Sequence, residues 1–398
     1  MTNKINIFKP FSSALFLLFA FLFISNATFA GDSDNKPAAM QSEVSVTAPA
    51  EGSDKKEHTE GGFDAGKMIM EHVSDSHSWH LFGHYAIPLP IIVKTDKGIE
   101  VFSSSHFGHE GEERYQGSNY NYGLVDGSIV VVDSQLEGVD AAATATLTDF
   151  SITKNVAAML ISMLLMLWVF LSVAKAYTKN PGKAPKGLQS FIEPLIIFVR
   201  DDVAKPSIGE KKYERFMPFL LTVFFFILFN NYLGLIPFFP GGVNLTGSIS
   251  IAMVLAGFTL LITFFIANKH YWRHVFAMPG VPIPVLIILT PIEILGLFLR
   301  PFVLMIRLFA NITAGHIIAL AFFSLIFIFG EMNAGLGLGV SLFSLVFTIF
   351  MGFLELLVAF LQAYVFTLLS AIYFGSAVDE GHDVHNHVDD HTDSRTTH

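Results

Sequence analysis

The sequence predicts an all-α polytopic membrane protein preceded by a small β-rich domain, and three observations support this fold class. Of the 398 residues, 52% are hydrophobic and only 15% are charged, a balance too apolar for a soluble domain of this size. Long uncharged segments, each able to cross a membrane, fill the second half of the chain. Charge is also divided: 31–150 carries 7 basic and 20 acidic residues, whereas 151–378 carries 14 basic and 8 acidic residues.

Residues 1–30 have the parts of a secretory signal peptide. Lys4 and Lys9 precede an apolar run from Ala14 to Ile24, and Thr28-Phe29-Ala30 forms a small-x-small cleavage site. The alternative is an uncleaved membrane anchor, for which the apolar run is short. We expect cleavage, which leaves the mature N-terminus outside the cytoplasmic membrane.

Two segments have the composition of disordered chain. Residues 31–62 are rich in Ala, Ser, Glu, Lys and Asp and show no apolar period, as expected of a linker. Residues 379–398 form an acidic, His-rich tail on the cytoplasmic side, which could bind metal weakly.

Residues 63–150 predict an acidic, β-rich domain outside the membrane. Apolar residues from Tyr85 to Val93 and from Ile99 to Phe102 flank a turn that contains Gly98, so we expect a β-hairpin. Ser128 to Val132, directly after Asp126-Gly127, predicts a further strand.

Residues 151–378 predict a membrane domain of five helices. We expect spans at Asn155–Ala174, at two segments of Phe216–Asn268 separated by Pro237–Gly242, at Val285–Phe329 and at Val340–Val378. Leu188–Val199 predicts a short interfacial helix, Lys269–His274 a basic turn, and Glu331–Gly339 a Gly-rich turn. The last two spans are much longer than about 20 residues, so they must tilt, bend or run partly along the membrane.

The distribution of basic residues predicts the orientation. Nine lie between Lys175 and Arg215 and two lie in 269–274, but none lies in 236–250 or 331–340. Because basic residues mark the cytoplasmic side, the N-terminus is expected outside and the C-terminus inside.

Five ionisable residues fall within the last two spans. An ionisable group at this depth costs several kcal/mol unless it faces a partner or water. Structural ion pairs are the plainer interpretation, but the number and spacing of these residues favour an ion path. The five are Glu293, Arg300, Arg307, His316 and Glu355.

The spacing of these residues predicts which of them meet. Glu293, Arg300 and Arg307 are seven apart and share one helical face, which Asn311 and Ala314 also join.

The last span runs in the opposite direction, so it presents its own polar residues at matching depths. Glu355 and Gln362 share a face there, so Glu355 can meet His316 in the outer half while Gln362 approaches Arg307 at mid-membrane. A His–Glu pair with access to water can relay protons, whereas Arg keeps its charge and acts as a fixed cation.

Three motifs in order resemble those of subunit a of F-type ATP synthases. They are Leu-Met-Ile-Arg-Leu-Phe-Ala-Asn-Ile-Thr-Ala-Gly-His at Leu304–His316, Gln-Ala-Tyr-Val-Phe-Thr-Leu-Leu at Gln362–Leu369, and Asn-Asn-Tyr-Leu-Gly-Leu-Ile-Pro at Asn230–Pro237. The resemblance implies that Arg307 is the stator arginine facing the carboxylates of a rotating c-subunit ring, with Ala310 and Ala314 on the ring-facing surface.

The resemblance also implies two offset half-channels. The outer one would be lined by His316, Glu355 and Asn231, and the inner one would open near Glu293. Gln362 and Asn311 would join the proton path near Arg307. Many bacterial members of that family carry Glu at the position of His316 and His at the position of Glu355. Here the two residues are exchanged, which resembles mitochondrial forms.

The partners implied are the c-subunit ring, the peripheral-stalk b subunits, the other subunits of the synthase and membrane lipid, with no nucleic acid. We expect a multi-pass protein of the bacterial inner membrane. No phosphate-binding Gly-rich loop occurs and there are no cysteines, so we expect no enzyme activity of the chain by itself, no cofactor and no metal.

Four histidines near Trp79 leave a choice open. His77, His80 and His84 have the spacing of one helical face and could bind Zn²⁺ together with His72. Solvent-exposed histidines on an acidic surface are favoured, and a proton-collecting role is a further hypothesis.

Two other classes of protein were weighed. A secondary ion-coupled transporter would show repeated halves, and we find no internal repeat. A membrane anchor for the outer domain would leave the five ionisable residues unexplained.

Overall fold

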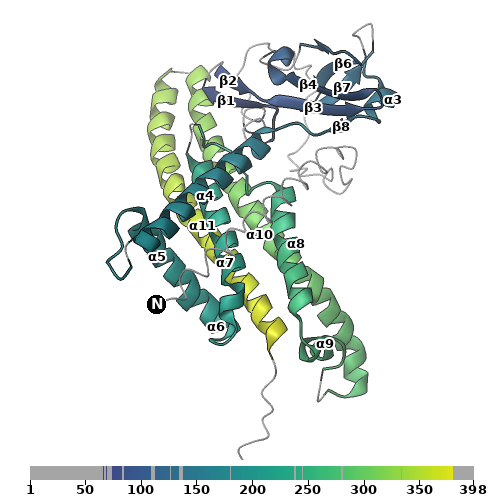
Figure 1. Ribbon diagram of the computed structural model, residues 1–398. Coiled ribbons are helices and arrows are strands. Elements are labelled where there is room, and N and C mark those ends of the chain that lie inside the picture. Colours follow the sequence, from purple (N-terminus) through teal and green to yellow (C-terminus); the bar gives the residue numbers. More distant parts are fainter. Residues whose placement is uncertain are drawn as a thin grey trace, which may run out of the picture.

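The computed structural model places a bundle of long helices below a small group of β-strands (Figure 1). It describes residues 66, 69, 74–82, 85–108, 113–125, 127–133, 138–179, 181–236, 239–243, 245–278, 281–332 and 334–379. The predicted signal peptide, the predicted linker, the tail beyond residue 379, His72 and His84 lie outside the described residues.

The strands form three small antiparallel sheets. A two-stranded arm pairs β1 with β2, and two three-stranded sheets have the orders β4-β3-β8 and β5-β6-β7. The strands are β1 (Ser78–Phe82), β2 (Tyr85–Pro88), β3 (Pro90–Thr95), β4 (Gly98–Ser103), β5 (Tyr115–Gln116), β6 (Asn121–Val125), β7 (Ser128–Val132) and β8 (Thr148–Asp149), with a 3-10 helix η3 (Ser104–Phe107) and a short helix α3 (Ala141–Thr144) between them.

The predicted hairpin is confirmed in part. Strands β3 and β4 pair from Pro90 with Ser103 to Thr95 with Gly98, and Gly98 has φ of 134°, which favours glycine. Tyr85–Pro88, however, pairs with β1 instead of continuing this hairpin. The prolines at 88 and 90 lack backbone N–H groups, so the strand is interrupted between them. The strand predicted at Ser128–Val132 is confirmed as β7.

Among the described residues, five helices are long and apolar enough to cross a membrane, as predicted for 151–378. They are α4 (Lys154–Lys179), α7 (Tyr213–Leu235), α8 (Ile249–Ile266), α10 (Ile283–Met332) and α11 (Ala334–Val378). Between α4 and α7 lie α5 (Leu188–Phe198), a π-helix η4 (Val199–Ala204) and α6 (Lys205–Ile208). At 1.5 Å per residue, α10 and α11 are both more than twice as long as a hydrocarbon core of about 30 Å.

Two predicted turns are wrong. The basic turn at Lys269–His274 is a helix, α9 (Lys269–Phe276), because Tyr271 and Val275 lie one turn apart and are both buried. The Gly-rich turn at Glu331–Gly339 is much shorter than predicted, since α10 continues to Met332 and α11 begins at Ala334. Glycine lowers helix stability by about 1 kcal/mol but does not forbid the conformation.

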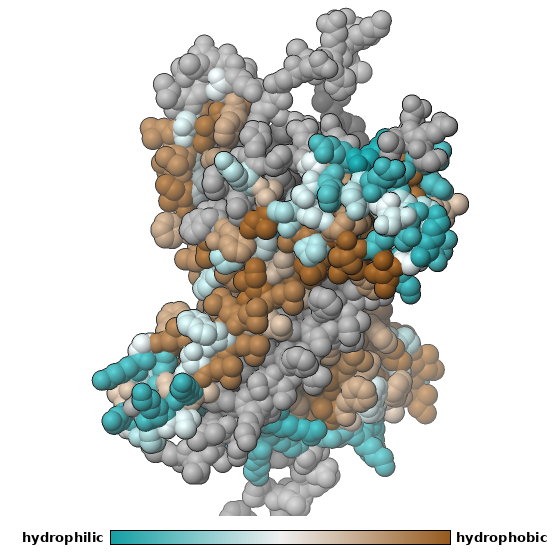
Figure 2. All heavy atoms as spheres, turned by 45° about the horizontal axis from the view of Figure 1, so that its top comes forward, coloured by the Kyte–Doolittle hydropathy of each residue, from teal (hydrophilic) through white to brown (hydrophobic). Residues whose placement is uncertain are grey.

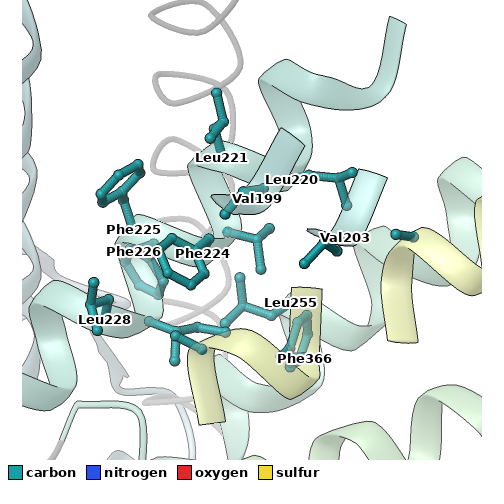
Figure 3. Close-up of a cluster of buried hydrophobic side chains, with 14 of the residues drawn as sticks. Val199, Val203, Leu220, Leu221, Phe224, Phe225, Phe226, Leu228, Leu255 and Phe366 are labelled. Atoms are coloured by element: carbon teal, nitrogen blue, oxygen red, sulfur yellow. The ribbon is translucent and has the colours of Figure 1, made fainter. Parts of the chain in front are cut away.

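The hydrophobic core of the membrane part is centred on α7. Phe224, Phe225 and Phe226 are fully buried and lie against residues of η4, α8 and α11, including Val203, Leu255 and Phe366 (Figure 3). In the most apolar 18-residue stretch of α7, 72% of the residues are buried, against 11% in α10 and in α11. These stretches of the two longest helices therefore lie largely at the surface of the chain.

The visible surface is divided into hydrophobic and hydrophilic regions. Hydrophobic residues cover the middle of the molecule, while hydrophilic residues gather on the β-strand region and at the opposite end (Figure 2). This distribution is the one expected of a protein with a membrane-embedded middle.

Candidate functional site

The candidate site lies where α10 and α11 pack along each other. His316 Nδ1 of α10 is 3.4 Å from Glu355 Oε1 of α11, and the two side chains are 14% and 10% exposed. Within the described part of the chain, this carboxylate oxygen accepts no hydrogen bond. The proximity predicted from helix direction is therefore present, as an enclosed pair whose carboxylate is not fixed by hydrogen bonds at that oxygen.

Two glycines leave the space that this pair occupies. A Cβ on Gly315 would lie 3.1 Å from Glu355 Oε1. A Cβ on Gly234 of α7 would lie 3.1 Å from the carbonyl oxygen of Val243 and 3.8 Å from His316 Nε2. Both glycines permit close approach of neighbouring helices, which a larger residue would prevent.

Asn231 connects α7 to α11 beside the same pair. It is 3% exposed, and its Nδ2 donates to the carbonyl oxygen of Ala359 at 3.0 Å, one helical turn from Glu355. Thr246, from the segment between α7 and α8, donates its hydroxyl to Asn231 Oδ1. The structure thus places Asn231 against α11, one helical turn from Glu355, and adds Thr246, which the sequence did not single out.

Deeper along α10 and α11, Asn311 meets Gln362. Asn311 Nδ2 donates to Gln362 Oε1 at 3.0 Å, and Gln362 is 3% exposed. Among the described residues, Gln362 Nε2 has no hydrogen-bond partner. Asn311 lies one turn after Arg307, so the predicted approach of Gln362 to the arginine face is present through Asn311, with no recorded bond to Arg307 itself.

Arg307 is half-buried at the border of the packed face of α10. Its neighbours Leu304 and Leu308 are buried, whereas Ala310 and Ala314 are exposed. No carboxylate of the described residues lies within 4.0 Å of its guanidinium group. A permanent cation in an apolar helix therefore lies next to an open surface of small residues.

Glu293 and Arg300 form a looser pair on α10. Arg300 Nη2 is 3.9 Å from Glu293 Oε2, with the side chains 42% and 26% exposed. The two residues are seven positions apart and lie on one helical face, as the sequence predicted. Both side chains are partly exposed, so this part of the face is not covered by the described chain.

The N-terminal histidines do not form the predicted arrangement. Ser78–Phe82 is strand β1, so the helical spacing considered for His77 and His80 is wrong. His77 is buried instead of solvent-exposed, and its Nε2 lies 3.1 Å from Asp149 Oδ2. Among the described residues, no group of three His, Cys, Asp or Glu could hold a metal ion.

The environment of Asp149 shows how firmly this pair is held. Burial would raise the pKa of the Asp149 carboxyl, but hydrogen bonds from His77 and Ser151 outweigh burial and lower it. The backbone N–H of Ser151 donates to the second carboxylate oxygen at 2.8 Å.

Comparison with known proteins gives two family matches. The model for the ATP synthase A chain matches residues 156–375, and a model described as a domain of unknown function, DUF8433, matches residues 68–150.

Two curated relatives are informative. The chain is 43% identical over 250 residues to ATP synthase subunit a of Chloroherpeton thalassium, covering 61% of this chain and 72% of that protein. It is 46% identical over 246 residues to ATP synthase subunit a 2 of Chlorobaculum tepidum, covering 60% of this chain and 66% of that protein.

The fold and site define a polytopic helical membrane protein. Its two longest spans enclose a titratable pair, and one of them carries a half-buried arginine with no carboxylate within 4.0 Å among the described residues. Residues 156–375, which contain all of these features, are the part that the family model matches. The chain belongs to the ATP synthase A chain family, the proton-translocating membrane part of ATP synthase. The resemblance stated from the three sequence motifs is confirmed.

Proposed function

We propose that the chain is the stator subunit of a rotary F-type ATP synthase and that it provides two offset proton half-channels separated by Arg307. The observation that supports this most is the surroundings of Arg307: a half-buried cation with no carboxylate within 4.0 Å in the described chain. Such a charge needs a counter-charge from elsewhere. A carboxylate of a passing c-subunit ring would supply it.

The exposed small residues support the same partner. Ala310 and Ala314 lie on the face of α10 that Arg307 borders, and they leave room for another helix to approach closely. We propose that the c-ring covers this face and much of the exposed apolar surface of α10 and α11.

The outer half-channel would run through the enclosed pair. A His–carboxylate contact of 3.4 Å, with an oxygen that accepts no hydrogen bond among the described residues, suits a proton that must be passed on. Asn231 would hold α11 at the level of Glu355, and Asn311 with Gln362 would continue the polar path towards Arg307.

The inner half-channel would open at Glu293. This carboxylate lies on the same helix face as Arg307 and is partly exposed beside Arg300. Arg307 between the two paths would repel protons that bypass the ring, because its guanidinium stays charged.

The remaining proposals concern placement. We propose a multi-pass protein of the bacterial inner membrane, with the β-strand region outside and the end of α11 in the cytoplasm. The basic α9 and the end of α11 lie at the opposite end of the molecule from the β-strands, which supports this orientation (Figure 1). The peripheral-stalk b subunits are further proposed partners.

The domain limits also remain a proposal. We divide the chain into a signal peptide (1–30), a linker (31–62), an outer domain (63–150), the membrane domain (151–378) and a tail (379–398). We propose that nucleotide chemistry belongs to other subunits.

The test is ATP-driven proton pumping in inverted vesicles that carry the Arg307→Ala variant. We expect pumping to fall to the level of vesicles without ATP. Arg273→Ala, which removes an exposed arginine of α9, is the matched control and should pump normally. Normal pumping by Arg307→Ala, in complexes assembled to the usual amount, would refute the proposed role.

A further inference from the structure

Trp79 of β1 belongs to the membrane domain more than to the β-strand region. It is only 3% exposed, yet it lies outside the cluster that forms the core of the strands. Trp79 packs with Ala158 of α4 and with Val243 of the segment between α7 and α8. Its ring also meets the ring of Phe239 edge-on, with centroids 5.1 Å apart. Trp79 is therefore the largest side chain that joins the β1–β2 arm to the membrane helices.

The residues before Trp79 fix the arm to the start of α4. The backbone N–H of Lys154 donates to the carbonyl oxygen of Ser76 at 2.8 Å, and the N–H of Asn155 donates to Asp75 Oδ1 at 3.0 Å. Because these bonds cap the first turn of α4, the arm cannot shift without loosening that helix end.

On its other side, Trp79 touches a segment that is tied to the candidate site. We call the described residues 239–243 and 245–247 the α7–α8 connection. Thr246 of the connection donates its hydroxyl to Asn231, and Thr313 of α10 donates its hydroxyl to the carbonyl oxygen of Gly247 at 3.2 Å. Thr313 precedes His316 by three residues, so it lies one turn away on the same side of α10.

The connection also packs directly onto the helix beside His316. The N–H of Gly242 donates to the carbonyl oxygen of Leu233 at 3.2 Å, and the carbonyl oxygen of Val243 lies against Gly234. A continuous set of contacts thus runs from Trp79 through the connection to the residues around His316 and Glu355.

We propose that Trp79 is a positioning residue for proton transfer: it holds the α7–α8 connection so that Asn231, His316 and Glu355 keep their mutual geometry. This gives the β1–β2 arm a function as a clamp on the outer half-channel. The inference rests on the proposed function of His316 and Glu355 as the outer path. It assigns no proton transfer to Trp79, whose indole stays neutral.

The test uses the whole synthase reconstituted in lipid vesicles with Trp79→Ala, Trp79→Phe or Val101→Ala in this chain. Val101 is 66% exposed on β4, away from the cluster, and serves as the control. Proton flux during ATP synthesis driven by an imposed pH difference is measured while pH is varied on one side at a time. We expect Trp79→Ala to lower flux several-fold and to shift its pH dependence on the outer side only. Trp79→Phe should restore most of the flux, and Val101→Ala should match the natural protein.

Wild-type flux and an unshifted outer pH profile in assembled Trp79→Ala complexes would overturn the inference. If that variant does not assemble, Phe239→Leu removes the ring contact from the other partner, which is 47% exposed. It should show the same shift to a smaller extent, and the absence of any shift would again overturn the inference. Loss of flux in His316→Ala alongside normal flux in Trp79→Ala would refute the clamp alone. Normal flux in both would refute the proposed function.

Discussion

Two buried His–carboxylate pairs in this chain have similar chemistry and different surroundings. In the β-strand region, His77 Nε2 lies 3.1 Å from Asp149 Oδ2. Between α10 and α11, His316 Nδ1 lies 3.4 Å from Glu355 Oε1. Asp149 is held through both oxygens, by His77 at one and by the backbone of Ser151 at the other. Glu355 Oε1 accepts no hydrogen bond among the described residues, although it is buried.

The difference separates a structural pair from a pair suited to proton transfer. A carboxylate with its hydrogen bonds satisfied keeps its charge and fixes the local fold. A carboxylate in a poorly satisfied, enclosed place can gain and lose a proton at lower cost, which is what a relay requires. The His316–Glu355 pair should therefore control activity, and the His77–Asp149 pair should control stability.

The largest effect is expected from removing either member of the membrane pair. His316→Ala and Glu355→Ala should each lower ATP-driven pumping by about 100-fold or more, the typical contribution of a positioned acid–base group. The exchange His316→Glu with Glu355→His should recover part of the pumping, because it keeps one acid and one base in place. Normal pumping by both single variants would remove the distinction between the two pairs.

A smaller effect is expected when the membrane pair is pushed apart. Gly315→Leu would place side-chain atoms where Glu355 now lies, since a Cβ alone comes within 3.1 Å of its Oε1. Such overpacking costs about 1–3 kcal/mol, and we expect reduced pumping in the assembled complex. Gly330→Leu on the same helix, where no atom lies within 4 Å of the added Cβ, should pump normally. Equal pumping by the two variants would contradict the enclosed geometry.

The His77–Asp149 pair should affect stability. Asp149→Asn weakens a charge-assisted hydrogen bond, so we expect the free energy of local unfolding to fall by about 1–3 kcal/mol. Hydrogen exchange measured on residues 74–154 of the full-length chain reports this change. Unaltered exchange would mean that the pair contributes nothing to the fold.

The pH dependence of that stability is the finest test. The pKa of Asp149 is lowered in the folded protein, so its contribution is fully present above the ordinary carboxyl pKa, about 3.9. It is lost as pH falls through the lowered folded value. The exchange rates of Asp149→Asn and the natural protein should therefore differ at neutral pH, and the difference should shrink as pH falls from about 4 through the lowered folded pKa. A difference that does not shrink on acidification below about pH 4 would contradict the assignment.

The sequence predicted the membrane part well because its signals are periodic and strong. Uncharged stretches located all five spans, and residues seven apart correctly placed Glu293 beside Arg300. The opposite directions of α10 and α11 were enough to predict the contact between His316 and Glu355.

Contacts between distant segments could not be read in the same way. Nothing in the spacing of Trp79 or Thr246 indicates that one packs against the α7–α8 connection and the other bonds Asn231. The exposed position favoured for His77 is wrong because its ring is buried against Asp149, a contact that local spacing does not indicate. The helical alternative fails at His80 because Ser78–Phe82 is a strand. Helix ends were also poorly predicted, as at Ala334, because glycine weakens a helix without ending it.

The central claim is that Arg307 blocks direct proton flow between the two half-channels and does not carry protons. The direct measurement is passive proton leak through vesicles that carry Arg307→Ala synthase stripped of its soluble sector. A fixed blocking cation predicts that leak is retained or increased while ATP-driven pumping is lost. A fall of both leak and pumping to the background of protein-free vesicles would contradict the account, because it would make Arg307 part of the conducting path.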